Sequence, residues 1–310
     1  MTRFVLRRLG WAVLTAWFVV TATFAMLAVI PADPARAILG PHATEETLER
    51  VRGRHCLDDG PLEAYGCWLV AVAKGDLGDS YRSGRRVVDI LGDRVWPTVQ
   101  LAIAALALQL AIGVPLGILA AARRRRWQDH ATSIATLVAQ SAPPFVVGTL
   151  LVYVLAYRFG WFPIAGYGTG GLDRLHHLVL PALTTAAFGT AYYARVVRAE
   201  MIDALDEDYV RTARAKGVGE RGVLLRHALR PSLGPLLTLV GLDLAAMLGG
   251  AVIIEPLFAW PGLGREVALA IREVDVPVIV GAVLVAALAV TLVNLVVDLA
   301  YAWIDPRLRE

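Results

Sequence analysis

Charged residues are scarce in this chain, and lysine is almost missing. Asp, Glu, Lys and Arg together make up 18% of the 310 residues, whereas a typical soluble domain has about 25%. The two lysines are Lys74 and Lys216, and each follows an alanine. The nucleotide-binding motif G-x-x-x-x-G-K-[ST] needs a lysine directly after a glycine. The chain therefore has no such phosphate-binding loop and cannot bind ATP in that way.

Motifs of catalysis and metal binding are missing as well. The sequence H-E-x-x-H does not occur, and Ser141 has no plausible partner base near it. The two cysteines, Cys56 and Cys67, are too few for a disulfide-rich miniprotein. Together with one nearby imidazole, His55, they are an incomplete ligand set for zinc. We therefore expect neither an enzyme nor a metal site.

Apolar residues, in contrast, are abundant. They make up 57% of the chain, and the mean hydropathy is +0.57. This is too much for one buried core, so the composition indicates an all-α integral membrane protein. A membrane-crossing helix needs about 20 mostly apolar residues. Six stretches qualify: Leu9–Ile30, Thr98–Ala122, Ala131–Tyr157, Leu178–Val197, Leu233–Glu255 and Pro277–Trp303.

Arginines near the ends of these stretches predict the orientation. Short cytoplasmic loops are enriched in Arg and Lys, and basic residues gather on one side of the predicted spans. We therefore expect both termini to be cytoplasmic and the first stretch to be a retained span. A nucleic-acid patch is the alternative for the four consecutive arginines, but the net charge of +3 is small for that role. The basic residues are Arg3, Arg7, Arg8, Arg123, Arg124, Arg125, Arg126, those between 195 and 230, Arg307 and Arg309.

Residues 31–96 then form an extracytoplasmic segment. Thr44 resembles a helix cap, and Pro61 opens an amphipathic stretch, so a small helical cap is expected. Both cysteines lie here, where a disulfide can persist. A Cys56–Cys67 bridge would stabilise the segment by about 3 kcal/mol. Two free or buried thiols are the alternative.

The predicted cytoplasmic loop at residues 198–231 is too long for a plain connector. Apolar residues recur in it at helical spacing. Its first half is acidic and its second half basic, as the helix dipole favours. Gly217 and Gly219 can end the helix. Such a helix, lying across the cytoplasmic ends of the spans, is typical of a docking element for a partner, although a solvated interfacial helix would show the same pattern.

The run from Asp208 to Gly217, continued by residues 225–230, looks like the "EAA" coupling loop of a known transporter family, although the naming triplet falls on Arg211-Thr212-Ala213 and Leu229-Arg230-Pro231 replaces the usual Leu-Pro. From this loop outward, the chain resembles over its whole length the permease subunits of binding-protein-dependent ABC importers of the dipeptide, oligopeptide and nickel class. The peptide subgroup shares both departures. Further matches are Phe4–Leu9, Ile30–Pro34, Gly75–Gly78, Gly166–Gly168, His177–Ala182, Gly249–Ala251, Glu255, Trp260–Gly264 and Asp305–Arg307.

The resemblance implies a type I ABC importer transmembrane domain at residues 97–303, in the cytoplasmic (inner) membrane of a bacterium. Residues 1–30 would be the N-terminal tail and first span, and 304–310 a cytoplasmic tail. The implied partners are a second homologous permease, two ATPase subunits that bind ATP and Mg, and an extracytoplasmic binding protein. The residues expected to contact the ATPases are Asp208, Tyr209, Arg211, Thr212, Ala213, Lys216 and Gly217. Ala213 and Gly217 would allow close approach.

The resemblance favours peptides as the substrate and leaves nickel as an alternative. His176 and His177 suggest nickel, but adjacent loop imidazoles are more often solvated. Polar residues inside spans often face an aqueous path, so the candidates for the pathway are Gln109, Gln140, Asp243, Asn294 and Asp298. Interhelical hydrogen bonds are the alternative for Asp243. An intramembrane enzyme and a secondary transporter are disfavoured, because paired catalytic groups and an internal repeat are both missing. Pro115 and Pro143-Pro144 predict breaks in their helices.

Overall fold

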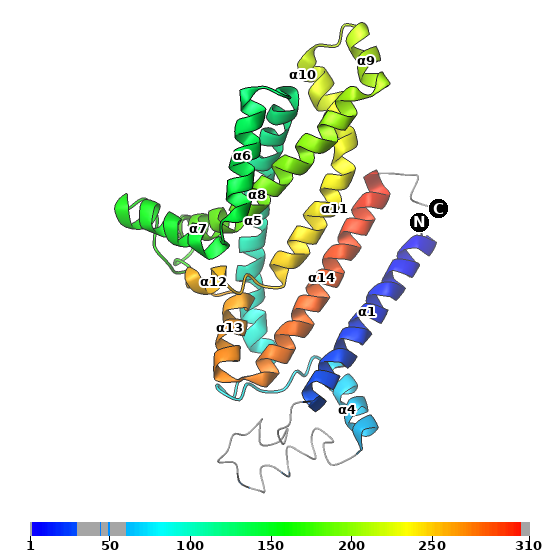
Figure 1. Cartoon of the computed structure of the whole chain (residues 1–310). Coiled ribbons are helices and arrows are strands. Elements are labelled where there is room, and N and C mark those ends of the chain that lie inside the picture. The colour runs from blue at the N-terminus through cyan, green and yellow to red at the C-terminus, as the bar shows by residue number, and fades with distance from the viewer. Residues whose placement is uncertain (1, 30–43, 45–48, 50–59, 305–310) are drawn as a thin grey trace.

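The computed structural model describes residues 2–29, 44, 49 and 60–304. This part of the chain is nearly all helical, and its one β-bridge joins Asp79 to Arg86. Figure 1 shows long helices running side by side, with α9 at one end of the molecule and α4 and α13 toward the other. The helices are α1 (Thr2–Val29), α4 (Pro61–Ala73), α5 (Val87–Ala122), α6 (Trp127–Ser141), α7 (Pro144–Leu151), the π-helix η1 (Val152–Arg158), α8 (Gly171–Asp206), α9 (Asp208–Ala215), α10 (Glu220–Gly222), the π-helix η2 (Val223–Ala228), α11 (Leu229–Leu248), α12 (Ile254–Leu257), α13 (Leu263–Glu273) and α14 (Val276–Ile304).

Four of the predicted spans are helices that are long and apolar enough to cross a membrane. They are α1, α5, the continuous run from Glu220 to Leu248, and α14. The fourth predicted span lies within α8, which is one unbroken helix of 36 residues. Helix α8 is less apolar than those four helices because tyrosines, arginines and acidic residues occupy its second half. The fifth predicted span is wrong at its C-terminal end, because α11 ends at Leu248 and Glu255 lies in α12.

The third predicted span is not one straight helix. It consists of α6 and the pair α7–η1, which meet at a bend of 101°. Ala142 and Pro143 have extended backbones between them. Neither Pro143 nor Pro144 has a backbone N–H to donate, and the position before a proline disfavours helix. Figure 1 shows α7 leaving the end of α6 sideways. The break predicted at these prolines is confirmed, whereas the one predicted at Pro115 is wrong, because α5 continues through it.

Helices α5 and α8 form the centre of the fold. Gly113 and Gly117 of α5 lie against α8 so closely that an added Cβ would come within 2.7 Å of the carbonyl oxygens of Thr190 and Ala194. Small residues four positions apart allow such close approach of helices in membranes. In return, Gly189 of α8 leaves the space that the Gln109 side chain occupies. The two backbones are thus held at short distance over several turns.

The cap helix α4 packs on α1, as expected of a folded outer segment. The hydroxyl groups of Tyr65 and Thr21 are 2.6 Å apart, and the Trp68 indole donates to the carbonyl oxygen of Val20 at 3.4 Å. Phe24 lies against both aromatic rings. Thr44 and Glu49 belong to the described part of the chain, but the other residues of the helix expected there lie outside that part, as does Cys56. Cys67 lies on α4, and the disulfide stays a prediction.

Candidate functional site

The helix predicted in the loop at residues 198–231 is present but divided. Instead of one helix, α8 extends to Asp206, and α9 begins at Asp208 after Glu207, whose backbone is extended. The Thr212 hydroxyl donates to the Asp208 carbonyl at 3.0 Å. Gly217 ends the helix with a φ of 81°, a conformation that glycine adopts without steric cost. Its N–H donates to the carbonyl of Arg214 at 3.0 Å.

The short helix α9 has one buried and one exposed face. Val210 and Ala213 are buried against the rest of the chain. Asp208 and Arg211 keep 92% and 72% of their side-chain surface exposed, although their side chains are paired at 3.0 Å. Tyr209 is 43% exposed. α9 therefore rests on the bundle through a narrow apolar edge and presents its polar face outward.

The predicted contact residues sort into two groups on this geometry. Asp208, Tyr209, Arg211, Thr212, Lys216 and Gly217 are exposed. Ala213 lies on the buried face of α9, so it packs against the rest of the chain and is not presented at the surface. A Cβ added to Gly217 would meet nothing within 4 Å. The need for glycine there comes from the backbone turn in this chain.

The polar candidates for the pathway lie in three separate places. Gln109 and Asp243 come together between α5 and α11, and the structure adds Tyr193 of α8, which the sequence reasoning missed. The Tyr193 hydroxyl donates to Asp243 at 3.4 Å, and the Gln109 amide also hydrogen bonds to this carboxylate. Gln109 is buried, and its Oε1 has no hydrogen-bond partner.

The other three candidates make their contacts outside that cluster. Gln140 of α6 accepts a hydrogen bond from Arg195 of α8 at 2.5 Å. Asp298 of α14 pairs with Arg8 of α1 at 2.7 Å. Together with Asn294 and Thr238, these two residues line a cavity of about 230 Å³ between α1, α11 and α14. The five predicted residues therefore do not form one continuous lining within the described part of this chain.

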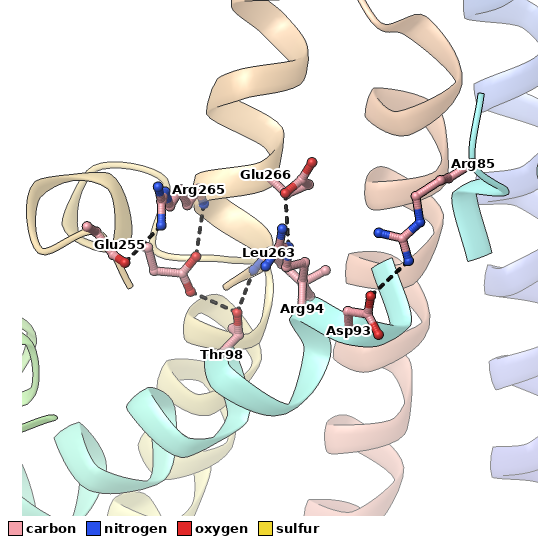
Figure 2. Close-up of polar contacts among 9 residues, drawn as sticks. Arg85, Asp93, Arg94, Thr98, Glu255, Leu263, Arg265 and Glu266 are labelled. Carbon is pink, nitrogen blue, oxygen red and sulfur yellow. Dashed lines mark hydrogen bonds and ion pairs between the residues drawn. The ribbon is translucent and has the colours of Figure 1, made fainter. Parts of the chain in front are cut away.

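A buried hydrogen-bond network joins α12 and α13 to α5 (Figure 2). Glu255 is fully buried. Its carboxylate accepts the Thr98 hydroxyl at 2.8 Å and the Arg265 backbone N–H at 3.0 Å. The Thr98 oxygen in turn accepts the N–H of Leu263 at 2.8 Å. An added Cβ at Gly262 would lie 2.4 Å from the carboxyl carbon of Glu255, so glycine is required there for the carboxylate to fit.

Trp260 completes this junction. Its indole N–H donates to the carbonyl of Pro97 at 2.8 Å, and the side chain is fully buried. The Tyr167 ring meets it edge-on at 4.7 Å, and the Tyr167 hydroxyl donates to Gln100 at 2.7 Å. The motif around Trp260 stands out in the sequence only through the family resemblance. Thr98 was missed, because an isolated threonine at the start of an apolar run carries no signal of its partner.

A second junction lies at the turn between α13 and α14. The buried carboxylate of Asp275 accepts the Ser80 hydroxyl at 2.6 Å and the Tyr81 N–H at 3.1 Å. Burial and the neighbouring Asp275 carboxylate raise the pKa of the Tyr81 hydroxyl well above its usual range, so this phenol stays neutral. Gly75 and Gly78 turn the preceding chain with φ values of 76° and 79°. The glycines of the Gly75–Gly78 motif therefore allow the chain to turn just before it reaches Ser80.

No group of three or more His, Cys, Asp and Glu side chains that could hold a metal ion occurs among residues 2–29, 44, 49 and 60–304. His176 hydrogen bonds to the carbonyl of Trp161 at 2.7 Å, and His177 to that of Asp173 at 2.9 Å. The two imidazoles are therefore engaged with the backbone in this structure.

Comparisons with known proteins agree with this architecture. The family described as "Binding-protein-dependent transport system inner membrane component" matches residues 113–310. The N-terminal family of the same transport-system membrane components matches residues 1–102.

Curated relatives match the full length. The chain is 38% identical over 309 residues to proteins named glutathione transport system permease protein GsiC from Escherichia coli strain K12 and from Shigella dysenteriae serotype 1. The match covers 100% of this chain and 99% of each relative.

Among solved structures, a chain of the MetNI methionine ABC transporter in an inward-facing conformation has a similar fold. Its TM-score is 0.57 at 17% sequence identity, and the match covers 70% of this chain and 96% of that one. At this identity the likeness shows the fold alone. The two family matches and the full-length relatives establish that this chain belongs to the family of inner membrane components of binding-protein-dependent transport systems, and is a multi-pass permease subunit of an ABC importer and not an enzyme.

Proposed function

We propose that this permease imports peptides, and that α9 is the element on which its ATPase subunits dock. The observation that carries the docking proposal is the shape of α9, whose apolar edge is buried while its polar face is exposed beyond the end of α8. ATP binding to separate subunits would move α9, and α8 would carry that movement into the bundle. Rigid-body transmission of this kind is a common form of switching.

The full-length relatives support a peptide substrate. They are named for glutathione transport, and glutathione is a tripeptide. Import would require an extracytoplasmic binding protein to deliver the peptide and a second permease to complete the pathway. Nickel remains the second candidate, and the engaged backbone contacts of His176 and His177 do not favour it.

The arrangement of charges supports a cytoplasmic location for α9 and for both termini. The four arginines at 123–126 lie in the turn between α5 and α6, at the same end of the molecule as α9 (Figure 1). Basic residues in short loops mark the cytoplasmic side. The outer junctions at Glu255 and Asp275 would then lie on the side from which substrate arrives.

The test is uptake by the purified complex reconstituted in liposomes. Arg211→Glu reverses a charge on the exposed face of α9 without touching its buried edge. We expect the ATPase subunits to be lost, or substrate-stimulated ATP hydrolysis and uptake to fall at least tenfold, while the permease itself still folds. Arg272→Glu is the matched control, because Arg272 is also exposed but lies on α13, far from α9.

Unchanged hydrolysis and uptake in Arg211→Glu would refute docking on α9. Labelled dipeptide, glutathione and nickel ion, offered in the same liposomes, distinguish the substrates. Uptake of nickel without uptake of either peptide would replace the peptide proposal with the alternative.

A further inference from the structure

The turn that carries the four arginines is bound tightly to α8. Asp129, in the first turn of α6, has only 4% of its side chain exposed. Its Oδ2 accepts the Nη2 of Arg198 at 2.9 Å, and its Oδ1 accepts the Nε of the same guanidinium. Paired hydrogen bonds of this kind fix the orientation of both groups as well as their distance.

A third donor completes the binding of this carboxylate. The backbone N–H of Arg125 donates to the Asp129 Oδ2 at 3.0 Å. Arg125 has a φ of 63°, a left-handed conformation that is uncommon for residues other than glycine. The local backbone therefore adopts a strained turn that places this N–H on the carboxylate. The charges of the four arginine side chains bear on the orientation in the membrane, but they do not explain the backbone conformation of Arg125.

The position of this contact relates it to α9. Arg198 precedes the end of α8 at Asp206 by eight residues, about 12 Å of helix. α9 follows after Glu207 alone. Between Arg198 and Asp206, α8 is held by buried packing of Met201, Ile202 and Ala204. A displacement of α9 would therefore reach Arg198 through Glu207 and a short, well-packed segment of α8.

The other end of the connection is α6, which packs on α8. α6 leads to the 101° bend at Pro143-Pro144, where the missing backbone N–H groups weaken the helix. α6 is thus a helix of 15 residues with a break at its far end, and Asp129 joins its near end to α8 by a charged pair.

We propose that the Asp129–Arg198 pair is a clamp that transmits movement of α9 into α6, so that both are positioning residues for energy coupling. This inference rests on the proposed docking of ATPases on α9. The clamp makes α6 move with α8 as one body. Without it, the ATPase subunits would still move α9, but α6 would follow only through packing and through the Gln140–Arg195 hydrogen bond near its other end.

The decisive readout is the number of substrate molecules imported per ATP hydrolysed. This ratio does not depend on how much folded complex is present, so a loss of stability alone does not change it. Asp129→Asn removes the charge and one strong acceptor, and Arg198→Lys keeps the charge but loses the paired geometry. We expect the ratio to fall at least fivefold in Asp129→Asn and by a smaller factor in Arg198→Lys, with the ATPases still bound.

A matched control lies in the same turn. Arg124 pairs with Asp206 at 2.9 Å, but both side chains are well exposed, at 44% and 67%. Exposed pairs of this kind contribute little, so Arg124→Ala is expected to keep the ratio within twofold of wild type. The exchange Asp129→Arg with Arg198→Asp restores opposite charges at the two positions, and is expected to recover part of the ratio.

The outcomes are separable. A wild-type ratio in both Asp129→Asn and Arg198→Lys overturns the clamp, and so does an equal fall in Arg124→Ala. If Asp129→Asn fails to assemble, Arg198→Lys and Asp129→Glu decide by the same ratio. If Arg211→Glu on α9 leaves coupling intact, the proposed docking fails first, and the clamp fails with it for that separate reason.

Discussion

At the scale of single residues, buried carboxylates organise the side of the molecule opposite α9. Glu255 accepts hydrogen bonds from Thr98 and from the backbone of Arg265. An ionisable group that is taken out of water is costly unless its hydrogen bonds are satisfied. The two acceptor oxygens of Glu255 are satisfied by groups from different helices. The same carboxylate therefore joins α12, α13 and the start of α5.

Replacing Glu255 tests this role. In Glu255→Ala, the Thr98 hydroxyl and the Arg265 N–H lose their acceptor in a buried place, which typically costs about 1–3 kcal/mol for each unsatisfied group. We expect a clear fall in the thermal midpoint of unfolding of the detergent-purified chain, measured by fluorescence. Glu255→Gln keeps one carbonyl oxygen and is expected to lose less.

Glu273→Ala serves as the comparison for that measurement. Glu273 pairs with Arg82 at 2.8 Å, but both side chains are at least one third exposed. Such pairs contribute about 0–1 kcal/mol. Equal midpoints for Glu255→Ala and Glu273→Ala would contradict the assigned importance of the Glu255 network.

At the scale of secondary-structure elements, glycine spacing explains the central contact. Gly113, Gly117 and Gly189 let α5 and α8 approach each other closely. In a membrane, helices gain little from hydrophobic burial against each other, so packing at short distance and interhelical hydrogen bonds become the main attractive terms. A side chain at these positions would separate the two helices.

Gly117→Ala tests the close approach. The added Cβ would lie 2.7 Å from both the Ala194 carbonyl oxygen and the Val197 Cβ, and overpacking of this kind typically costs about 1–3 kcal/mol. We expect a lower midpoint of thermal unfolding. Gly92→Ala is the control on the same helix, because a Cβ there meets nothing within 4 Å; it is expected to be neutral or slightly stabilising. The idea is wrong if the two variants unfold alike.

At the scale of the whole molecule, two sets of contacts lie at opposite ends of the bundle. The ion pairs of the α5–α6 turn lie near α9, and the networks around Glu255 and Asp275 lie toward α13 (Figure 1). The long helices α5 and α8 connect the two ends. A permease needs such rigid connections, because energy enters on one side of the membrane and substrate on the other.

The orientation of the molecule can be measured directly. With both native cysteines replaced by serine, Lys216→Cys places a thiol beside α9 and Arg272→Cys places one on α13, and both positions are exposed. A membrane-impermeant maleimide is expected to label Arg272→Cys in intact cells, and Lys216→Cys only in inverted vesicles, with at least a tenfold preference each way. The reverse pattern would invert the proposed topology.

The class of protein and the approximate positions of its helices followed from the sequence alone. Runs of apolar residues and loop arginines are local properties, and they are read without knowledge of neighbours in space. The helix ended by Gly217 and the break at Pro143-Pro144 were predicted for the same reason, since glycine and proline act on their own backbone.

The tertiary structure alone decided which side chains meet. The sequence placed Gln109, Gln140, Asp243, Asn294 and Asp298 in one category, and the fold distributes them over three places. It also made Glu255 a partner of Thr98, and Asp129 a partner of Arg198, across 157 and 69 positions of the chain. Such pairs depend on the rotation and register of one helix against another. Those quantities are determined by close packing between helices, and no local pattern of residues specifies them.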